Sequence, residues 1–480
     1  MHKQILMKRE KPEVFPKSKT GVEGLDEITG GGFPKGRPTL ICGSAGCGKT
    51  LMGVQFLVRG ITEFGEPGVF MSFEETSKDL TDNVRSLGFE LDKLIIQGKL
   101  RVDHIQIEKS EIEETGDYDL EGLFIRLNHA IDSIGAKRVV LDTIESLFGG
   151  LDNVAILRSE IRRLFQWLKE KGITTIITGE RGESSLTRQG LEEYVSDCVI
   201  LLDFRVIDQI ATRRLRIVKY RGSTHGTNEY PFLIDETGIS VLPITSLKLE
   251  HKTSSELLSY GHPGLDKLFE KEGFYRGTSV LVSGSAGTSK TTLASYFALS
   301  SCQRKESTLF FSFEESPDQL VRNMKSIGID LKPYVKSNLL FIHSSRPSLQ
   351  GLEMHLLVLH KLIHELKPRT VIIDPISSLV TVGNSSEVRA MLVRLMDMLK
   401  VNQINAMFTS LTHNGSSDDK DLTVDAVSSL SDTWIRVSNE EKKDVRSRIL
   451  NIVKSRGMGH SNQVHEFVIE GKGIKIKKTV

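Results

Sequence analysis

The stretch that decides the fold is Gly43-Ser44-Ala45-Gly46-Cys47-Gly48-Lys49-Thr50, a Gly-rich loop that ends in Lys and Thr. The apolar run before it, residues 38–42, predicts a buried strand, and residues 51–58 predict the helix that leaves the loop. Backbone N–H groups of such a loop, together with the positive end of the helix, hold a triphosphate. Lys49 would reach the outer phosphates, and the Thr50 hydroxyl would ligate Mg²⁺.

Length and composition are those of an ordinary globular protein. With 480 residues the chain is too long for one hydrophobic core, and we expect about two to four domains. The net charge of +1 gives no basic field that would attract nucleic acid. The sequence has neither a secretory segment nor an apolar run of the roughly 18 residues that cross a bilayer, so we expect a cytoplasmic protein without membrane contact. The cysteines lack metal or redox spacing and are expected to be reduced structural thiols: Cys42, Cys47, Cys198 and Cys302.

The chain is a tandem repeat, because the landmarks of its first half return about 230 to 240 residues later. Gly-x-x-Gly-Leu-Asp at 21–26 returns at 261–266, and Ser-Phe-Glu-Glu at 72–75 returns at 312–315. An apolar run ending in Asp at 139–142 returns at 371–374, and Lys-x-Arg-Gly-x-x-His at 219–225 returns at 454–460. We therefore expect two homologous domains, 1–247 and 256–480, joined by a polar linker at 248–255.

Within each copy, short apolar runs alternate with longer helical patterns. In the first copy this predicts strands at 68–73, 138–142 and 173–179, and helices at 77–87 and 154–171. Such alternation is typical of an α/β domain around a mostly parallel sheet. Residues 213–220 and 230–234 look like antiparallel strands added to that sheet. Ligands of such sheets bind at the carboxyl ends of the strands, where the Gly43 loop, Glu74 and Asp142 would meet.

Carboxylates follow two of the expected strands. Asp142 stands where a P-loop enzyme holds Mg²⁺, usually through water, although Asp is also a common turn residue. Glu74 or Glu75 would orient and deprotonate a water that attacks the γ-phosphate. Alternatively, the negative charges of the two Glu residues only stabilise the positive N-terminal end of the next helix, with Thr76 or Ser77 as its cap. The counterparts in the second copy are Glu314, Glu315 and Asp374.

The second Gly-rich loop departs from the pattern at one position. Ser289 replaces the second Gly in Gly284-Ser285-Ala286-Gly287-Thr288-Ser289-Lys290-Thr291. A side chain there is expected to cost about 1 to 3 kcal/mol of strain if the backbone needs a Gly-only conformation. Lys290 and Thr291 are intact, so we expect this copy to bind ATP, and its catalytic competence stays open.

Lys219, Arg221 and His225 lie far from the first loop in sequence, on an expected antiparallel edge. They are either a solvated face or, because their spacing occurs twice, cations that reach a neighbour's phosphates as arginine fingers do. The second interpretation requires a ring of identical subunits.

The tandem loops, the two Ser-Phe-Glu-Glu segments and the run Tyr220-Arg221-Gly222-Ser223-Thr224-His225 resemble the KaiC family, the ATPases and autokinases of the cyanobacterial clock. Their order and spacing match over nearly the whole chain. The resemblance implies a double-ring homohexamer of RecA-like domains with ATP and Mg²⁺ at the subunit interfaces. It further implies that the first ring hydrolyses ATP, while the second phosphorylates and dephosphorylates a Ser/Thr pair in a timekeeping, clock-like or stress-signalling system.

That pair maps onto Ser428 and Ser429. The family places Ser-Thr shortly before Thr-Asp-Thr, and Ser428-Ser429-Leu430-Ser431-Asp432-Thr433 keeps this frame. When Ser196-Asp197 is aligned with Ser431-Asp432, Glu193 and Tyr194 fall opposite the pair, so only the second copy offers aliphatic hydroxyls. An unmodified polar loop is the alternative.

The resemblance also implies further contacts and partners. The long tail by which the family engages KaiA is missing after 471–473, so we expect no KaiA binding, whereas a KaiB-like partner is implied. Ile327 stands where the family stacks a Trp on adenine, which would weaken that contact. The implied metal ligands are Thr50, Asp142, Thr291 and Asp374. Outside the loops, the implied nucleotide contacts are Leu51, Ser86, Lys219, Tyr220, Arg221, Ser223 and His225 in the first ring, and Thr292, Arg448, Lys454, Ser455, Arg456 and His460 in the second.

Two other classes remain open. A DNA recombinase or helicase can have the same fold, but it needs basic or aromatic DNA-binding loops, and residues 145–153 are acidic and Gly-rich. A nucleotide-dependent scaffold, in which the second loop binds ATP without turnover, would remain free of phosphate.

Overall fold

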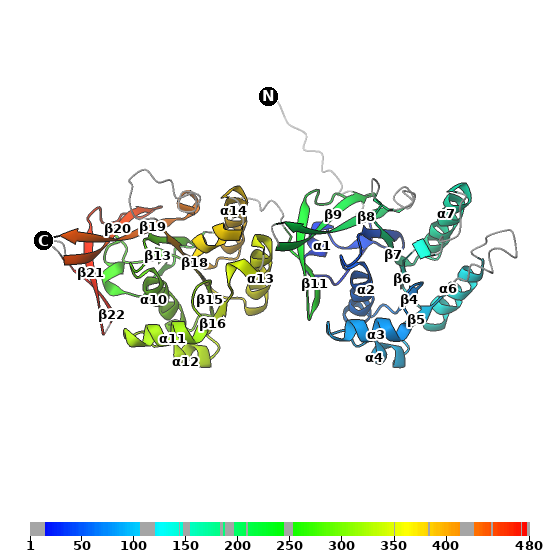
Figure 1. Cartoon of the computed structure of the whole chain (residues 1–480), viewed down its shortest axis with the longest axis horizontal. Coiled ribbons are helices and arrows are strands. Elements are labelled where there is room, and N and C mark those ends of the chain that lie inside the picture. Colours follow the sequence, from blue (N-terminus) through cyan, green and yellow to red (C-terminus); the bar gives the residue numbers. More distant parts are fainter. Residues whose placement is uncertain are drawn as a thin grey trace, which may run out of the picture. The chain divides into compact units, whose positions relative to one another are not determined.

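The computed structural model describes residues 15–105, 121–143, 145–146, 154–182, 186–187, 196–207, 210–243, 253–349, 351–382, 385–412, 427–442, 445–471 and 473–477. The chain divides into two compact units, Met1–Thr245 and Ser246–Val480 (Figure 1). Most of the expected linker lies outside the described residues, as do Glu193, Tyr194 and most of the 145–153 loop. No described helix is long and apolar enough to cross a membrane.

The first unit is an α/β domain whose helices and strands alternate along the chain. Its elements are β1 Lys17–Ser18, α1 Leu25–Ile28, β2 Phe33–Pro34, β3 Pro38–Gly43, α2 Lys49–Phe64, β4 Gly68–Ser72, α3 Ser77–Arg85, α4 Leu91–Ile96, β5 Leu100–His104, α6 Glu121–Ile134, β6 Arg138–Asp142, α7 Val154–Glu170, β7 Thr174–Glu180, β8 Cys198–Ile207, β9 Ile210–Tyr220, β10 Glu229–Asp235 and β11 Gly238–Val241.

One nine-stranded sheet, in the order β11-β10-β9-β8-β3-β7-β6-β4-β5, runs through the first unit. The strands from β5 to β8 in that order are parallel, and β9, β10 and β11 continue the sheet in antiparallel pairing. Strand β3 therefore lies in the interior, with parallel neighbours on both sides. Its carboxyl end delivers the Gly43 loop.

Alternation of side chains along these strands builds a core on each face of the sheet. Phe70 and Val140 pack into the cluster that contains α2, α3 and α4 residues, whereas the neighbouring Met71 and Leu141 pack under α6 and α7. Strand residues that are apolar on both sides are what a sheet covered by helices on both faces requires. Helix α2 ends at Gly65 in the left-handed conformation, which Gly adopts without strain.

The second unit repeats this architecture. Its sheet has the order β16-β15-β17-β18-β14-β19-β20-β21-β22, with β14 in the place of β3. Its elements are β12 Leu257–Leu258, α9 Pro263–Asp266, β13 Phe274–Tyr275, β14 Ser279–Gly284, α10 Lys290–Gln303, β15 Thr308–Ser312, α11 Pro317–Ser326, α12 Lys332–Lys336, β16 Leu340–Ser344, η2 Pro347–Leu349, α13 Leu352–Leu366, β17 Thr370–Asp374, η3 Ile376–Val382, α14 Ser385–Val401, β18 Asn405–Leu411, β19 Thr433–Lys442, β20 Val445–Ser455, β21 His465–Glu470 and β22 Gly473–Ile476.

The predicted fold class is confirmed: both units are mostly parallel α/β domains of RecA-like type. Each strand and helix predicted in the first copy is present, and the largest difference is at the end of α2, which continues six residues beyond the predicted 51–58. One expectation is wrong in part. Strand β9, which carries Lys219, is not an edge strand, because β10 pairs with its residues 214–216. Beyond Arg216, however, the structure pairs β9 only with β8, so the end that carries Lys219 does lack a partner on that side within the described sheet.

Candidate nucleotide sites and the opposite edge of each sheet

The first Gly-rich loop connects β3 to α2. Gly43 must be Gly, because a Cβ at this position would lie 2.4 Å from the carbonyl oxygen of Leu202. Lys49 is buried, and its Nζ donates hydrogen bonds to the carbonyl oxygens of Gly43 (3.0 Å) and Ser44 (3.1 Å). The loop carbonyls thus hold the ammonium group at the mouth of the loop, where the phosphates of a nucleotide would meet it.

Thr50 and Asp142 lie beside this loop and contact each other. The Thr50 hydroxyl donates to Asp142 Oδ2 at 2.8 Å, and the Thr178 hydroxyl donates to Oδ1. Burial raises the pKa of the Asp142 carboxyl, and the hydrogen bonds from Thr178 and Thr50 oppose this rise. A hydroxyl and a buried carboxylate at this spacing are oxygen ligands of the kind that Mg²⁺ takes, so these residues fit the ion.

The two adjacent Glu residues point in different directions. Glu74 Oε1 accepts hydrogen bonds from the hydroxyls of Thr143 and Ser146, both at 2.8 Å, and so lies beside Asp142. Glu75 Oε2 instead accepts from Asn83 Nδ2 in α3 at 3.4 Å. The cap of α3 is Thr76, whose hydroxyl accepts from the Asp79 backbone N–H. Glu74 is therefore neither the cap nor part of the helix, and it is the carboxylate that faces the candidate metal ligands.

The second site repeats this geometry. Lys290 Nζ donates to the carbonyl oxygens of Gly284 (2.9 Å) and Ser285 (2.8 Å). Asp374 is buried and accepts from the Thr409 hydroxyl, and burial raises the pKa of its carboxyl against the opposing hydrogen bonds of Thr409 and Thr291. Thr291 and Asp374 therefore fit Mg²⁺ as the first pair does.

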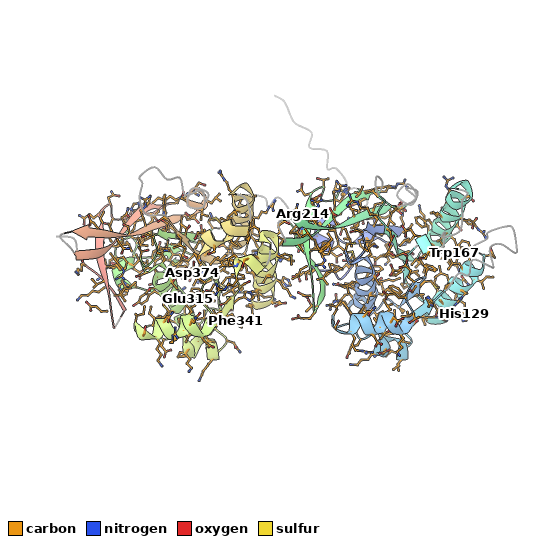
Figure 2. The ribbon with its side chains drawn as sticks, in the orientation of Figure 1. His129, Trp167, Arg214, Glu315, Phe341 and Asp374 are labelled. Carbon is orange, nitrogen blue, oxygen red and sulfur yellow. The ribbon has the colours of Figure 1, made fainter. Side chains whose placement is uncertain are left out.

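Glu314 and Glu315 also divide in the manner of the first pair. Burial, and next the neighbouring Asp374, raise the pKa of the Glu314 carboxyl, while Lys290 lowers it. Glu315 accepts a hydrogen bond from Asn323 Nδ2 at 3.1 Å (Figure 2 labels Glu315 and Asp374). Glu314 is thus the member of the pair that shares the electrostatic environment of the loop lysine.

Ser289 adopts the backbone conformation for which Gly is favoured. Its φ is 73° and its ψ is 30°, close to the 100° and 20° of Gly48 in the first loop. The left-handed conformation is uncommon for Ser but sterically accessible to it. The loop keeps its shape with Ser at this position, and the substitution adds strain without moving Lys290 away from the loop carbonyls.

The cations predicted to touch nucleotide lie at the other end of the sheet. Cys198, at the start of β8, pairs with Thr39 at the start of β3 and with Tyr220 at the end of β9. Lys219 and Arg221 therefore flank the amino end of β3, whereas the Gly43 loop leaves its carboxyl end. A six-residue strand spans about 20 Å, so these cations cannot reach the loop of their own domain.

The residues around Arg221 are held by ion pairs and hydrogen bonds. Asp197 lies 3.6 Å from Arg37 and 3.7 Å from both Lys169 and Arg221. The Arg221 side chain is nevertheless 53 % exposed, so it is accessible to a partner. The Tyr220 ring is buried, and its hydroxyl donates to the Gly32 carbonyl at 2.8 Å. Only its backbone is left for a nucleotide.

The second unit separates its predicted contacts in the same way. Lys454 and Ser455 pair with Trp434 and Thr433 at the amino end of β19, opposite the Gly284 loop. Arg448 lies at the other end of β20, where its Nε donates to the carbonyl of Gly287 in its own loop at 3.3 Å. The sequence analysis assigned these cations to one set of nucleotide contacts. In the structure Arg448 lies near the end of β20 beside the Gly284 loop, and Lys454 lies at the opposite end of the same strand.

The remaining predicted contacts have ordinary local roles in the described structure. Ser86 and Ile327 end α3 and α11, where Ser86 is exposed and Ile327 packs partly against the core. Ser223 accepts a hydrogen bond from Lys17 Nζ at 2.6 Å, and His225 stacks on Tyr220. His460 Nδ1 lies 3.1 Å from the Ser461 carbonyl, and Thr292 is buried in α10.

Ser428 and Ser429 lie in a short helical turn, residues 427–430, directly before β19. Ser429 is exposed and Ser428 is half-buried. The guanidinium Nη2 of Arg456 donates to the Ser429 carbonyl at 2.5 Å, and the backbone N–H of Arg456 donates to the Asp432 carbonyl at 2.8 Å. The candidate acceptors and Arg456 thus occupy one edge of the sheet, opposite the loop of the same domain.

Comparison with known proteins agrees with these features. The model of the KaiC ATPase family matches residues 18–246 and again 258–480. The chain is 55% identical to the circadian clock protein KaiC2 of Synechocystis sp., over 96% of this chain and 81% of that protein. It is 37% identical to the circadian clock oscillator protein KaiC of Synechococcus elongatus, over 97% and 90% of the two chains. The chain is also 37% identical to the circadian clock oscillator protein KaiC of Thermostichus vulcanus, over 95% of this chain and 88% of that protein. With two complete family domains, each built around a P-loop, the chain belongs to the KaiC family of ATPases.

Proposed function

We propose that this ATPase is a ring-forming autokinase whose second domain transfers the γ-phosphate of ATP to Ser428 or Ser429 of a neighbouring subunit. One observation carries the proposal. The acceptor turn and Arg456 occupy the edge of the sheet opposite the domain's own Gly284 loop. Transfer needs the acceptor oxygen within about 3.5 Å of the phosphorus, and the six residues of β14 span about 20 Å. The donor must then be the loop of another chain.

The transfer step uses groups that the second unit already assembles. The acceptor hydroxyl forms a bond to the γ-phosphorus, the bond from that phosphorus to the bridging oxygen breaks, and ADP leaves. The hydroxyl proton passes to Glu314, which lies beside Asp374 and Lys290. Mg²⁺, held by Thr291 and Asp374 and in the first unit by Thr50 and Asp142, would neutralise the charge on the phosphates.

In the first domain the same arrangement would hydrolyse ATP. That domain has the Gly pattern intact, and Glu74 stands where it can take the proton of an attacking water. Lys219 and Arg221, at the opposite edge, would contact the phosphates held by the next subunit. Such a contact is heterologous and forms a ring only if the rotation between subunits closes, and the family resemblance favours a closed homohexamer. A role in timekeeping or stress signalling with a KaiB-like partner is the corresponding biological proposal.

Intact mass spectrometry after incubation with ATP and Mg²⁺ tests the proposal. We expect the wild type to gain one or two phosphates, and the Ser428→Ala, Ser429→Ala double variant to gain none. Ser337→Ala, which removes an exposed Ser elsewhere in the second unit, is the control and should label as the wild type does. A double variant that still gains phosphate would show that other residues are the acceptors.

The strained Ser289 supports a second candidate, a scaffold whose second domain binds ATP without transferring phosphate. It predicts stable ATP occupancy and an unmodified mass in the same experiment. A recombinase would instead form filaments on DNA, and its binding would weaken steeply with salt.

A further inference from the structure

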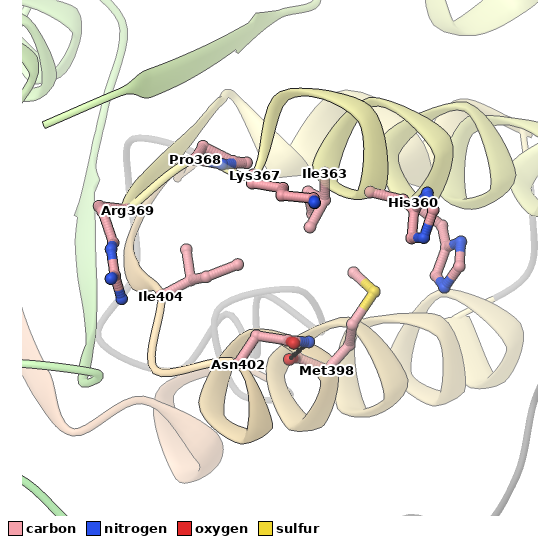
Figure 3. A pocket seen from close by; sticks show the side chains of 9 residues that line it. His360, Ile363, Lys367, Pro368, Arg369, Met398, Asn402 and Ile404 are labelled. Carbon is pink, nitrogen blue, oxygen red and sulfur yellow. Dashed lines mark hydrogen bonds between the residues drawn. The ribbon is translucent and has the colours of Figure 1, made fainter.

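A cavity of about 390 Å³ lies between α13 and α14 of the second unit, within the size range of small-molecule sites. Figure 3 shows Ile363 and Lys367 along its α13 side, Met398 and Asn402 along its α14 side, and Arg369 and Ile404 at one end. Arg369 directly precedes the five-residue strand β17, which ends at Asp374. The cavity is therefore about 16 Å along that strand from the candidate metal ligand and is separate from the nucleotide site.

Basic side chains dominate the lining. His360 and His364 are four residues apart on α13 and so lie on one helical face, and Lys367 and Arg369 follow where that helix ends. Met398 and Ile404 add apolar side chains to the lining. None of the nine described lining residues is acidic. Two cations without a lining carboxylate disfavour a metal ion and favour an anion.

The first unit provides an internal comparison, because different side chains occupy the space between its equivalent helices, α6 and α7. At the position of Met398 it has Trp167, whose ring packs on Phe124 at 5.4 Å and which Figure 2 labels. At the positions of the two His residues it has Asn128 and Asp132, which hydrogen-bond to each other at 2.8 Å. The first unit therefore lacks both His residues and fills the place of Met398 with an aromatic ring, although it keeps a cation, Lys137, at the position of Arg369.

The backbone at Lys367 strengthens this comparison. Lys367 ends α13 with φ 45° and ψ 52°, in the left-handed region, and the equivalent residue of the first unit is Gly135 with φ 62°. Gly adopts this conformation freely, whereas a residue with a Cβ does so at a cost in free energy. A strained residue that carries a charge into a cavity is a pointer to binding.

We propose that this cavity binds a small organic anion, with a phosphate or carboxylate held by Lys367 and Arg369 and an apolar body against Met398 and Ile404. The proposal goes beyond the autokinase function and does not rest on it.

The test is calorimetric titration of the full chain with its nucleotide sites saturated by Mg²⁺ and a slowly hydrolysed ATP analogue. The probes are 1-naphthyl phosphate, 1-naphthoate and neutral 1-naphthol. We expect one anion per chain to bind, with the ratio of the first two affinities identifying the preferred head group. Naphthol binding as tightly as the anions, or no anion binding at millimolar concentration, would overturn the proposal.

Three variants locate the site. Lys367→Gly installs the residue of the first unit and should weaken anion binding about tenfold, the usual contribution of one charge-assisted hydrogen bond. Lys305→Gly is the matched control, because Lys305 is exposed, has φ 62° and lies outside the cavity lining. Met398→Trp should abolish binding by filling the cavity. Unchanged affinity in Lys367→Gly, which keeps the left-handed backbone that Gly135 has in the first unit, would overturn the assignment.

Discussion

Arg456 donates a hydrogen bond from its guanidinium to the backbone carbonyl of Ser429 at 2.5 Å. This contact joins a predicted phosphate-binding cation to a predicted phosphate acceptor, although 27 residues separate them in the chain. Because both lie at the amino end of β19, opposite the Gly284 loop of their own unit, the proposed transfer needs a donor loop from another subunit. The same logic applies in the first unit to Arg221 and the Gly43 loop.

The two loop lysines differ in their expected effect on ATP hydrolysis. Lys49→Ala should abolish most of the steady-state hydrolysis, because its loop has the complete Gly pattern and its lysine already sits at the loop mouth. Lys290→Ala should reduce hydrolysis far less. The test is the steady-state rate of phosphate release from ATP, measured for the two purified variants and the wild type. Equal losses would mean that hydrolysis is shared between the two domains.

Removing Arg221 should impair hydrolysis in the first ring without unfolding it. A cation that contacts a neighbour's phosphates is worth about 10³- to 10⁵-fold in rate. The Arg221 side chain is half exposed, and the buried Asp197 carboxylate keeps Arg37 and Lys169 as partners when Arg221 is removed, so we expect little loss of stability. Arg221→Ala should therefore lose activity and keep its melting temperature. Arg37→Ala breaks another ion pair to Asp197 and serves as the control. A loss of activity of the same size in Arg37→Ala would argue that Asp197, not the neighbour's phosphate, is the relevant partner.

The pH dependence of autophosphorylation should report Glu314. Burial and Asp374 raise the pKa of this carboxyl above its ordinary value of 4.5. A general base works only when ionised, so the rate should fall as the pH falls through this raised pKa, at a higher pH than an ordinary Glu would give. Single-turnover labelling as a function of pH measures the acid limb. In Glu314→Gln the labelling should be slow and this limb absent, and an unchanged limb would assign it to another group.

Ser289→Gly should improve the second site. Relief of about 1 to 2 kcal/mol of left-handed strain exceeds the roughly 0.4 to 1 kcal/mol that Gly adds to the entropy of the unfolded chain. We expect a net gain of up to about 1 kcal/mol in unfolding free energy, measured by denaturant titration, and faster phosphorylation. The reverse change, Gly48→Ser, should harm the first site, since a Cβ there lies 2.9 Å from the Ile234 side chain. A less stable Ser289→Gly protein would mean that the Ser side chain makes a favourable contact.

Much of the fold follows from local sequence signals. The runs at β3, β4, β6 and β7 have apolar residues at consecutive positions in their centres, as strands covered on both faces do. Because the chain repeats, each landmark could be identified twice. Strand β8 was missed, although its first half, residues 198–202, is an apolar run like those of the predicted strands. Its place between β3 and β9 depends on long-range pairing that no local pattern contains.

The sequence predicted which residues belong to the candidate sites, but it did not predict where each side chain lies. Adjacent Glu74 and Glu75 look alike in sequence, and only the contacts with Thr143 and Asn83 separate them. Arg448 and Lys454 lie six residues apart on one strand, yet Arg448 contacts the loop of its own domain and Lys454 lies at the opposite end of the strand. The α13–α14 cavity was not predicted, because it depends on how two helices pack together, and no local pattern contains that information.

Transfer between subunits is the central claim, and mixing two inactive variants tests it most directly. Lys290→Ala chains retain the acceptor serines but lack the loop lysine, and Ser428→Ala, Ser429→Ala chains retain the lysine but lack the acceptors. Neither alone should be labelled by radioactive ATP. When the two are unfolded, mixed and reassembled together, we predict label on the Lys290→Ala chains only. An unlabelled mixture, under conditions in which identically treated wild type is labelled, would contradict the account and place donor and acceptor in the same chain.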